Sequence, residues 1–125
     1  MITLYYDVGN ASCIQAMKWF KEYNIKINTK RIEQMSSNEL ICILSLTENG
    51  FSDILKCPTR AGQKVLNQIK NIEDSTFNSS INYILNNTNL LKGPIIIDNN
   101  KLVIGYKAEN MRIFLPSKYR EAELI

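Results

Sequence analysis

The pattern of apolar and polar positions in the first third of the chain predicts a strand, a helix and a second strand. Residues Ile2–Tyr6 are β-branched or aromatic without a breaker, which is typical of a buried strand. Over residues 11–23 the apolar side chains recur at helical spacing, which predicts an amphipathic helix. Residues Ile25–Ile32 begin with alternating apolar and polar side chains, as expected for a half-exposed strand. The helical stripe consists of Cys13, Ala16, Met17 and Phe20, widened by Trp19 and Tyr23.

The middle of the chain, from about residue 36 to about residue 90, has helical periodicity interrupted by turn residues. Ser36 and Glu39 have the spacing of a capping box, in which each side chain accepts a hydrogen bond from the backbone of the other. This part is therefore predicted to be a run of short helices. Breaks are expected at Asn49-Gly50, at Cys57-Pro58 and in the asparagine-rich stretch 86–89.

The last third of the chain returns to strand patterns and closes with a helix. Pro94–Asp98 is a continuous apolar run, and Leu102–Ile104 is a second one. The turn residues Asn99 and Asn100 between them predict a β-hairpin. Helical spacing returns over Asn110–Leu115, so a short C-terminal helix is expected.

The predicted order of elements is strand–helix–strand, then short helices, then strand–strand–helix. Two strands joined through a helix imply a right-handed parallel crossover, whereas the hairpin adds antiparallel strands. We therefore expect an α/β protein with a mixed sheet and helices packed on its faces. This is the layout of the thioredoxin-like fold with a helical insertion at about residues 36–90. The 125 residues are expected to form a single domain.

Composition and charge narrow the function classes. The net charge of +3 comes from scattered Lys and Arg residues, so the clustered basic surface of a DNA-binding protein is not indicated. The chain has no His, which excludes His-based acid–base catalysis and most common zinc sites. We expect no metal, nucleotide or organic cofactor. Neither a signal peptide nor a membrane-spanning apolar stretch is apparent, so a cytoplasmic protein is expected.

The three cysteines, Cys13, Cys42 and Cys57, are an odd number for a disulfide framework, so free thiols are expected. Cys42 and Cys57 are interpreted as structural. Cys13 follows a small polar loop, the place where redox proteins carry a C-x-x-C pair, but the first place of that pair is Asn10. Asn10 is also a favourable helix N-cap residue. Cys13 shares the apolar stripe of its helix and is interpreted as a core thiol, although a thiol near a helix N-terminus ionises more easily where solvent reaches it.

Several segments together resemble the Spx/MgsR regulators, which are close relatives of the ArsC-type arsenate reductases. The resemblance runs from residue 1 to about residue 120. Its specific part is the series P-I-I-I-D, L-x-I-G-Y and R-x-F-L-P in residues 94–116. It also includes MITLYY at the N-terminus, the helix CIQAMKWF, TENG at 47–50 and the pair Thr59-Arg60.

The resemblance implies a thioredoxin-like domain that is not an enzyme. Such regulators bind the C-terminal domain of the RNA polymerase α subunit and modulate stress-related transcription. A glycine of the T-E-x-G segment lies at the polymerase contact in this family, and Gly50 matches it. From the residues alone, Gly50 is interpreted as the C-terminal stop of a helix, and Phe51 as either a core residue or an exposed anchor. The expected polymerase-binding residues are Thr47, Glu48, Asn49, Gly50 and Phe51.

The resemblance also implies that reductase chemistry is lost. The nucleophile of the reductases takes the first place of the C-x-x-C loop, which is Asn10 here, and an amide cannot attack arsenate. Of the three arginines that hold the oxyanion, only Arg60 is matched, because Gly93 and Tyr106 stand at the other two places. Without the first cysteine, an intact C-x-x-C redox switch is also absent. A cis-proline packs beside this loop in thioredoxin-like folds, so the Gly93-Pro94 bond is expected to be cis. The redox or ligand loop is expected to contain Asn10, Cys13, Arg60 and Pro94.

Two alternatives stay open. One is a thiol-dependent reductase, arsenate reductase-like or glutaredoxin-like, that uses Cys13. The other is a domain that has lost both activities and binds a different partner. For the regulator, the expected partner is the C-terminal domain of the polymerase α subunit, with promoter DNA contacted indirectly. Lys118 and Arg120 are either a solvated basic end or an auxiliary contact to polymerase or DNA. No membrane partner is expected, and the chain is expected to act as a monomer.

Overall fold

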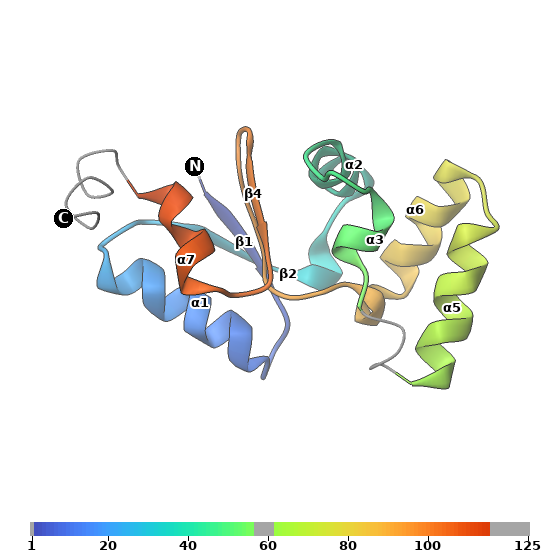
Figure 1. Ribbon diagram of the computed structural model, residues 1–125, viewed down its shortest axis with the longest axis horizontal. Coiled ribbons are helices and arrows are strands. Elements are labelled where there is room, and N and C mark those ends of the chain that lie inside the picture. Colours follow the sequence, from blue (N-terminus) through green and yellow to red (C-terminus); the bar gives the residue numbers. More distant parts are fainter. Residues whose placement is uncertain (1, 57–61, 116–125) are drawn as a thin grey trace.

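A four-stranded sheet with the strand order β2-β1-β3-β4 forms the centre of the computed structural model, which describes residues 2–56 and 62–115 (Figure 1). Strand β1 (Thr3–Tyr6) pairs in parallel with β2 (Asn28–Arg31) and antiparallel with β3 (Ile95–Asp98). Strand β4 (Lys101–Ile104) completes a hairpin with β3. The mixed sheet, the parallel crossover and the hairpin predicted from the sequence are thereby confirmed.

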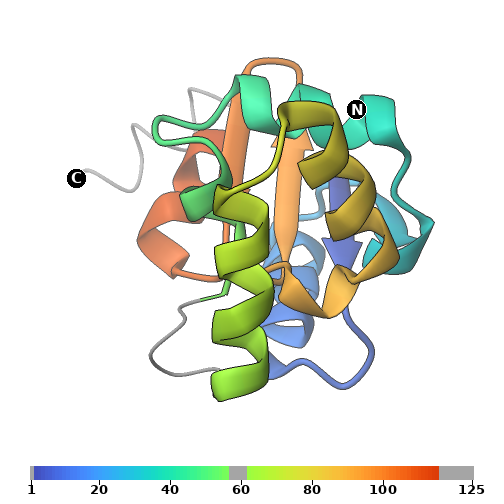
Figure 2. The ribbon, with the colours of Figure 1, turned by 90° about the vertical axis from the view of Figure 1, so that its right-hand side faces the viewer.

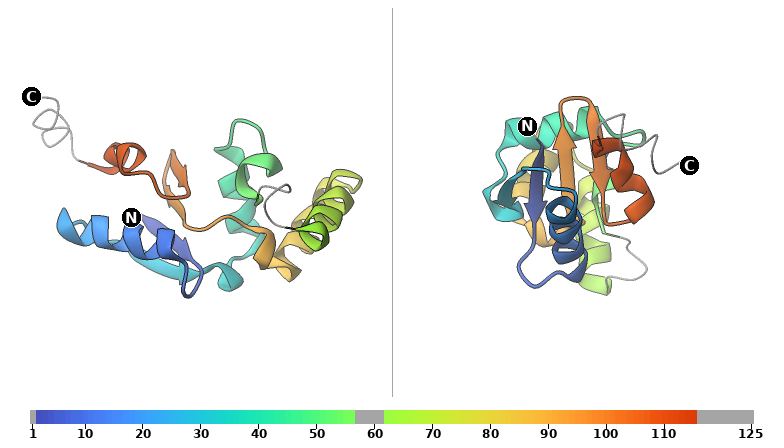
Figure 3. Two further views of the ribbon diagram at one scale, coloured as in Figure 1. Left: turned by 60° about the horizontal axis from the view of Figure 1, so that its bottom comes forward. Right: turned by 90° about the vertical axis from the view of Figure 1, so that its left-hand side faces the viewer.

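One face of the sheet is covered by helix α1 (Ala11–Glu22), which connects β1 to β2, and by the C-terminal helices α7 (Ala108–Met111) and η3 (Arg112–Phe114). Figure 1 shows α1 and α7 on the same side of the sheet, and the right-hand view of Figure 3 places both in front of the strands. Most of the stripe predicted for α1 packs inward, but Met17 is only half-buried, and Tyr23 lies after the helix and is 37% exposed. Its fully buried residues are Cys13, Ala16, Trp19 and Phe20.

The opposite face carries the helical insertion. Figure 2 shows its two longest helices, α5 and α6, side by side at the end of the molecule. The run of short helices is confirmed for the described residues, whereas the predicted break at Cys57-Pro58 lies outside them. The insertion contains the helices α2 (Ser37–Ser45), α3 (Phe51–Ile54), α5 (Gln63–Glu73) and α6 (Phe77–Asn86), with the 3₁₀ turns η1 (Ile32–Gln34) and η2 (Thr88–Leu90) at its ends.

The alternation of side chains along each strand divides the core into two parts. Leu4, Ile96 and Val103 lie in register on neighbouring strands and pack with α1 and α7. Tyr5 and Ile95, one position along, face the helical insertion instead. Because successive strand residues point to opposite faces, a sheet only four residues long can fill both cores.

Two elements differ in extent from their predictions. The strand expected over Ile25–Ile32 is reduced to Asn28–Arg31. At its start the backbone N–H of Ile25 still closes the end of α1 on the carbonyl of Phe20, and at its end the chain turns into η1 and buries Ile32 in the core of the insertion. The helix expected over Asn110–Leu115 begins earlier, as α7, and tightens into the 3₁₀ turn η3, as the ends of helices often do. The spacing of apolar residues in the sequence alone does not predict where this strand and this helix begin and end.

A short antiparallel bridge closes the base of the α5–α6 hairpin. Leu55, directly after α3, pairs with Leu91, directly after η2. The backbone N–H of Lys56 donates to the carbonyl of Leu90, and that of Lys92 donates to the carbonyl of Ile54, both at 2.8 Å. Residues 54–56 and 90–92 are therefore held together as a rigid pair.

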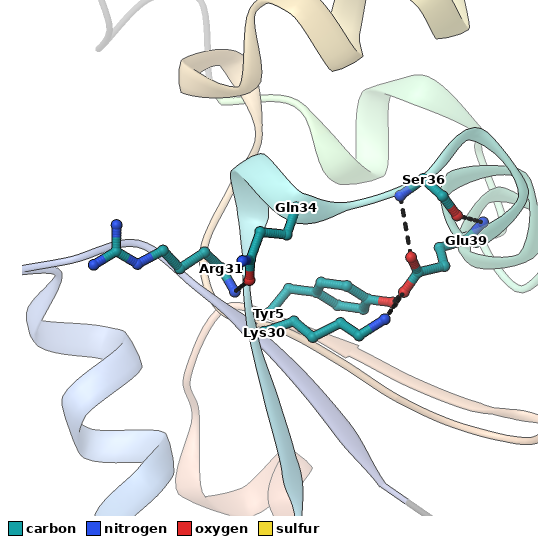
Figure 4. A network of polar contacts seen from close by, with 6 residues as sticks. All are labelled: Tyr5, Lys30, Arg31, Gln34, Ser36 and Glu39. Carbon is teal, nitrogen blue, oxygen red and sulfur yellow. Dashed lines mark hydrogen bonds and ion pairs between the residues drawn. The ribbon is translucent and has the colours of Figure 1, made fainter.

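The carboxylate of Glu39 joins the insertion to the sheet (Figure 4). Its Oε1 accepts the backbone N–H of Ser36 at 3.1 Å, while Ser36 Oγ accepts the backbone N–H of Glu39, which confirms the predicted capping box at the start of α2. Its Oε2 accepts the hydroxyl of Tyr5 on β1 and the ammonium of Lys30 on β2, the latter at 3.2 Å. One carboxylate thus receives donors from a helix and two strands.

These donors set the protonation of both partners. Burial by itself raises the pKa of Glu39, but the hydrogen bonds from Tyr5, Ser36 and Lys30 outweigh it and lower the pKa from 4.5 to about 2. Burial and the hydrogen bond to Glu39 raise the pKa of the Tyr5 phenol above its ordinary value. The ionised carboxylate and the neutral phenol are therefore the stable pair.

We expect Glu39→Gln to lower the free energy of unfolding by about 1–3 kcal/mol at neutral pH, the range for losing hydrogen bonds to a charged group. Because the pKa of Glu39 is depressed in the folded state, its contribution is fully present above about pH 4.5 and is lost as the pH falls toward about 2. Urea unfolding of wild type and variant should therefore show a stability gap that narrows with acid.

The matched control is Glu22→Gln, which removes the same charge from an exposed position at the end of α1. It should change the free energy of unfolding by less than about 0.5 kcal/mol. A gap for Glu39→Gln that does not change with pH would contradict the role of the ionised carboxylate.

Candidate functional site

The loop from Thr47 to Phe51 connects α2 to α3 and is fixed by side chains at both of its ends. Thr47 Oγ1 donates to the carbonyl of Leu44 at 2.7 Å and accepts the backbone N–H of Gly50 at 3.0 Å. Asp53, on α3, reaches back over the loop. Its Oδ2 accepts the backbone N–H groups of Glu48 and Asn49 at 3.1 and 3.0 Å, and its Oδ1 accepts the side-chain amide of Asn49 at 3.3 Å.

Sequence analysis did not single out Asp53. The backbone hydrogen bond from Asn49 is the main cause that holds the pKa of Asp53 below its ordinary value, assisted by the Asn49 amide and by Glu48. The signal in the sequence is an acidic residue three positions after Gly50, in the first turn of α3, where a side chain can reach back to free backbone N–H groups. Asp53 therefore shares with Thr47 the role of holding this loop in shape.

Gly50 lies at the start of α3, not at the end of α2, so the prediction that it stops a helix is wrong. Helix α2 ends at Ser45, and the N–H groups of Leu46 and Thr47 close its last turn on Ile43 and Leu44 without a glycine. The backbone of Gly50 has φ +70° and ψ −133°, which side-chain-bearing residues rarely adopt. A Cβ placed there would meet no atom within 4 Å, so the backbone of the loop is open to approach from outside.

Phe51 is half-buried, so it is neither wholly a core residue nor an exposed anchor. It packs against the core of the insertion, and its ring centroid lies 5.8 Å from that of Phe77. Phe77 is 50% exposed. Glu48 and Asn49 are exposed on the other side of Gly50. Of the predicted residues, Thr47 and Glu48 line one hollow and Asn49 and Phe51 line another, on the two sides of the loop.

The second predicted site lies at the start of α1. Asn10 is the N-cap of this helix, and its Oδ1 accepts the backbone N–H of Cys13 at 3.1 Å, which confirms the capping prediction. The Gly93-Pro94 bond is cis, as expected, and Pro94 is buried. A Cβ added to Gly93 would lie 3.2 Å from the sulfur of Cys13, so this turn and the thiol are neighbours. Arg60, the fourth predicted residue, lies outside the described residues.

Cys13 is a core thiol, as predicted, with 1% of its surface exposed. Burial is the main cause that raises its pKa, the nearby Asp7 carboxylate raises it further, and only a hydrogen bond with the Asp7 backbone acts in the opposite direction. Because the thiolate is the reactive form, burial and the raised pKa both disfavour reaction at Cys13.

Cys42 differs from its prediction. It was expected to be structural, but it is exposed on α2, because the buried face of that helix consists of Leu40 and Ile43 on either side of it. Cys57 lies outside the described residues. Within the described part of the chain, Cys13 and Cys42 are both free thiols.

The cleft beside the Asn10 loop is polar. Its lining includes the carboxylates of Asp7 and Glu33, and Lys56 is the one cation among its described residues. Burial raises the pKa of Asp7, although the charge of Lys56 opposes this. An oxyanion would therefore meet two acidic side chains here. The remaining lining consists of Val8, Gly9, Asn10, Asn86, Asn87, Thr88 and Asn89.

Metal-binding clusters and membrane-spanning helices are both absent from the described part of the chain. No group of three His, Cys, Asp or Glu side chains in residues 2–56 and 62–115 is arranged to hold a metal ion. No helix in the same ranges combines the length and the apolar character needed to span a bilayer.

We predict that Cys42 is alkylated by iodoacetamide much faster than Cys13, because Cys42 is exposed and Cys13 is buried with a raised pKa. Peptide mapping by mass spectrometry after a short exposure of the folded protein measures both rates. Unfolding in urea should make the two rates similar. Equal rates in the folded protein would contradict the burial of Cys13.

Comparison with known proteins identifies the family. The chain matches the ArsC family over residues 6–114. It is 34% identical over 99% of its length to the global transcriptional regulator Spx of Streptococcus mutans, of which it covers 90%. It is also 34% identical over its full length to the global transcriptional regulator Spx 1 of Lactococcus lactis, of which it covers 97%.

Solved structures support the same fold at lower identity. A putative ArsC family related protein from Bacteroides fragilis superposes with a TM-score of 0.74 at 19% identity, covering 90% of this chain and 95% of that one. An arsenate reductase from Vibrio cholerae superposes with a TM-score of 0.69 at 16% identity, covering 91% and 97%. The predicted thioredoxin-like α/β fold of the ArsC type is thus confirmed. The chain belongs to the ArsC family and, within it, to the family of the Spx regulators.

Proposed function

We propose that this protein is a cytoplasmic transcriptional regulator that binds, as a monomer, the C-terminal domain of the RNA polymerase α subunit. The observation that carries the proposal is the 34% identity to proteins named as global transcriptional regulators, which extends over 99% of the chain. The contact surface in this proposal is the loop from Thr47 to Phe51, and promoter DNA is contacted only indirectly.

The geometry of the loop supports this role. Its backbone is held by Thr47 and Asp53 before any partner arrives, so little conformational entropy has to be lost on binding. Gly50 has open space where a side chain would stand, which lets a partner approach the backbone closely. The half-buried ring of Phe51 adds apolar area beside it. Such a rigid patch with an apolar edge fits a protein–protein contact.

The start of α1 supports a role without catalysis. Asn10 uses its side chain as a cap, so the place of the nucleophile holds an amide. Cys13 is buried with a raised pKa, and two carboxylates line the adjacent cleft. We therefore propose that the protein neither reduces arsenate nor carries a C-x-x-C switch within this loop.

We expect Gly50→Arg to weaken binding to the purified C-terminal domain of the α subunit at least about tenfold in calorimetry, because a long charged side chain would enter the contact. Gly62→Arg is the matched control. Gly62 also caps a helix without a side chain, has a positive φ and has no atom within 4 Å of its missing Cβ. Both variants should therefore lose a similar amount of stability, about 1–2 kcal/mol, and only the first should lose binding.

Asp53→Ala provides a second test that leaves Gly50 in place. It removes the acceptor of Glu48 and Asn49 and should weaken binding through the shape of the loop, while the rest of the fold is kept. Absence of binding by the wild-type protein would defeat the proposal. Equal loss of binding in Gly50→Arg and Gly62→Arg would show that the contact lies elsewhere.

The reductase alternative predicts a different result. We expect no turnover of arsenate when the protein is supplied with glutathione and glutaredoxin, or with thioredoxin, because the buried Cys13 thiol is not ionised. We also expect Cys13→Ser to bind the polymerase domain as well as wild type does. Arsenate turnover that disappears in Cys13→Ser would favour the reductase instead.

A further inference from the structure

A cavity of about 610 Å³ lies inside the helical insertion, between α3, α5 and α6. This volume is within the range of small-molecule sites, about 300–1,000 Å³. Its described lining contains both apolar and polar side chains. The apolar lining consists of Phe51, Leu55, Ile69, Ile72 and Phe77.

Two lysines contribute to the lining of the cavity. Lys56 and Lys92 both line it, and both belong to the rigid bridge of residues 54–56 and 90–92. They stand at diagonal positions of this antiparallel pair, so their backbones lie about 7–8 Å apart. Both lysines therefore contribute to the wall of one space.

No carboxylate offsets these charges in the cavity. None of the described residues that line it is acidic. Within residues 2–56 and 62–115, neither lysine forms an ion pair. Each lysine also lines a neighbouring hollow that contains carboxylates, Lys56 with Asp7 and Glu33, and Lys92 with Glu48 and Asp53. The described residues hold neither ammonium group in a salt bridge, so both can contribute to binding an anion at the cavity.

The apolar wall is incompletely covered. Phe77 lies at the cavity with half of its surface exposed, and its ring packs at 44° against that of Phe51. An exposed aromatic ring costs free energy that a bound apolar group would recover. The wall thus favours a ligand with a chain or ring body.

We propose that this cavity binds an amphipathic carboxylate, a molecule with one acid group and an apolar body. The two ammonium groups would give charge-assisted hydrogen bonds to the carboxylate, while the aromatic and aliphatic wall would bury the body. The lysines would repel a cationic amphiphile. A neutral amphiphile would gain only the free energy of burying its apolar body. This proposal does not depend on polymerase binding.

Titration of the full-length protein with decanoate, below its critical micelle concentration, tests the site in NMR amide spectra. We expect saturable shifts in α3, α5 and α6, and none in α1 on the far side of the sheet. Decanol, which has the same chain without the charge, should bind about tenfold more weakly or worse, and decyltrimethylammonium more weakly still. No saturable binding of decanoate, or equal binding of decanol, would overturn the proposal.

The double variant Lys56→Met/Lys92→Met should lose the preference for decanoate over decanol, about tenfold, while its affinity for decanol stays the same. Lys70→Met is the control, because Lys70 is exposed on α5 and does not line the cavity. If the double variant does not fold, Ser75→Trp at an exposed lining position should block decanoate by filling the space. A preference that survives in the double variant, or that is lost equally in Lys70→Met, would overturn the proposal.

Discussion

The polar connection between the helical insertion and the sheet centres on one carboxylate, that of Glu39. It caps the first turn of α2 and accepts hydrogen bonds from side chains on β1 and β2. A carboxylate has enough acceptor sites for these donors, whereas an amide or a hydroxyl would leave some of them unpaired. Since α2 leads directly into the loop before α3, the orientation of that loop relative to the sheet is set at the same place.

The two faces of the sheet have separate chemistry. On the α1 face, the helix start that could activate a thiol is occupied by the side chain of Asn10, and the thiol of Cys13 is enclosed in the core. On the face of the insertion, backbone groups near Gly50 are open, and a cavity is formed beside them. The scaffold of a redox protein is thus retained while its accessible features lie in the inserted helices.

The sequence predicts the structure correctly where residues close together in the chain determine it. The apolar run in Pro94–Asp98, the stripe of α1 and the caps at Asn10 and Ser36 all depend on neighbours in the chain. The sequence-based prediction was wrong where contacts between distant parts of the chain determine the boundaries of an element. Gly50 starts a helix because Thr47 and Leu46 already end the preceding one, and β2 ends where Ile32 is buried in the core of the insertion.

Only part of the candidate site could be predicted from the sequence. The loop at Gly50 was located through resemblance, but the role of Asp53 becomes visible only once its three hydrogen bonds are known. Exposure of Cys42 depends on which side of α2 meets the sheet. The cavity could not be foreseen, because its walls come from residues 49–56, 69–80 and 92, which no local pattern connects.

The bridge between Leu55 and Leu91 has a consequence for how the chain tolerates change in length. It closes a loop that contains α5 and α6, so both ends of that loop are fixed by backbone hydrogen bonds. For a closed flexible loop, each doubling of length costs only about 0.6 kcal/mol of chain entropy. Insertions in the turn between α5 and α6 therefore leave the sheet under little strain, whereas length changes inside either helix would displace buried core residues such as Ile72 and Ile84.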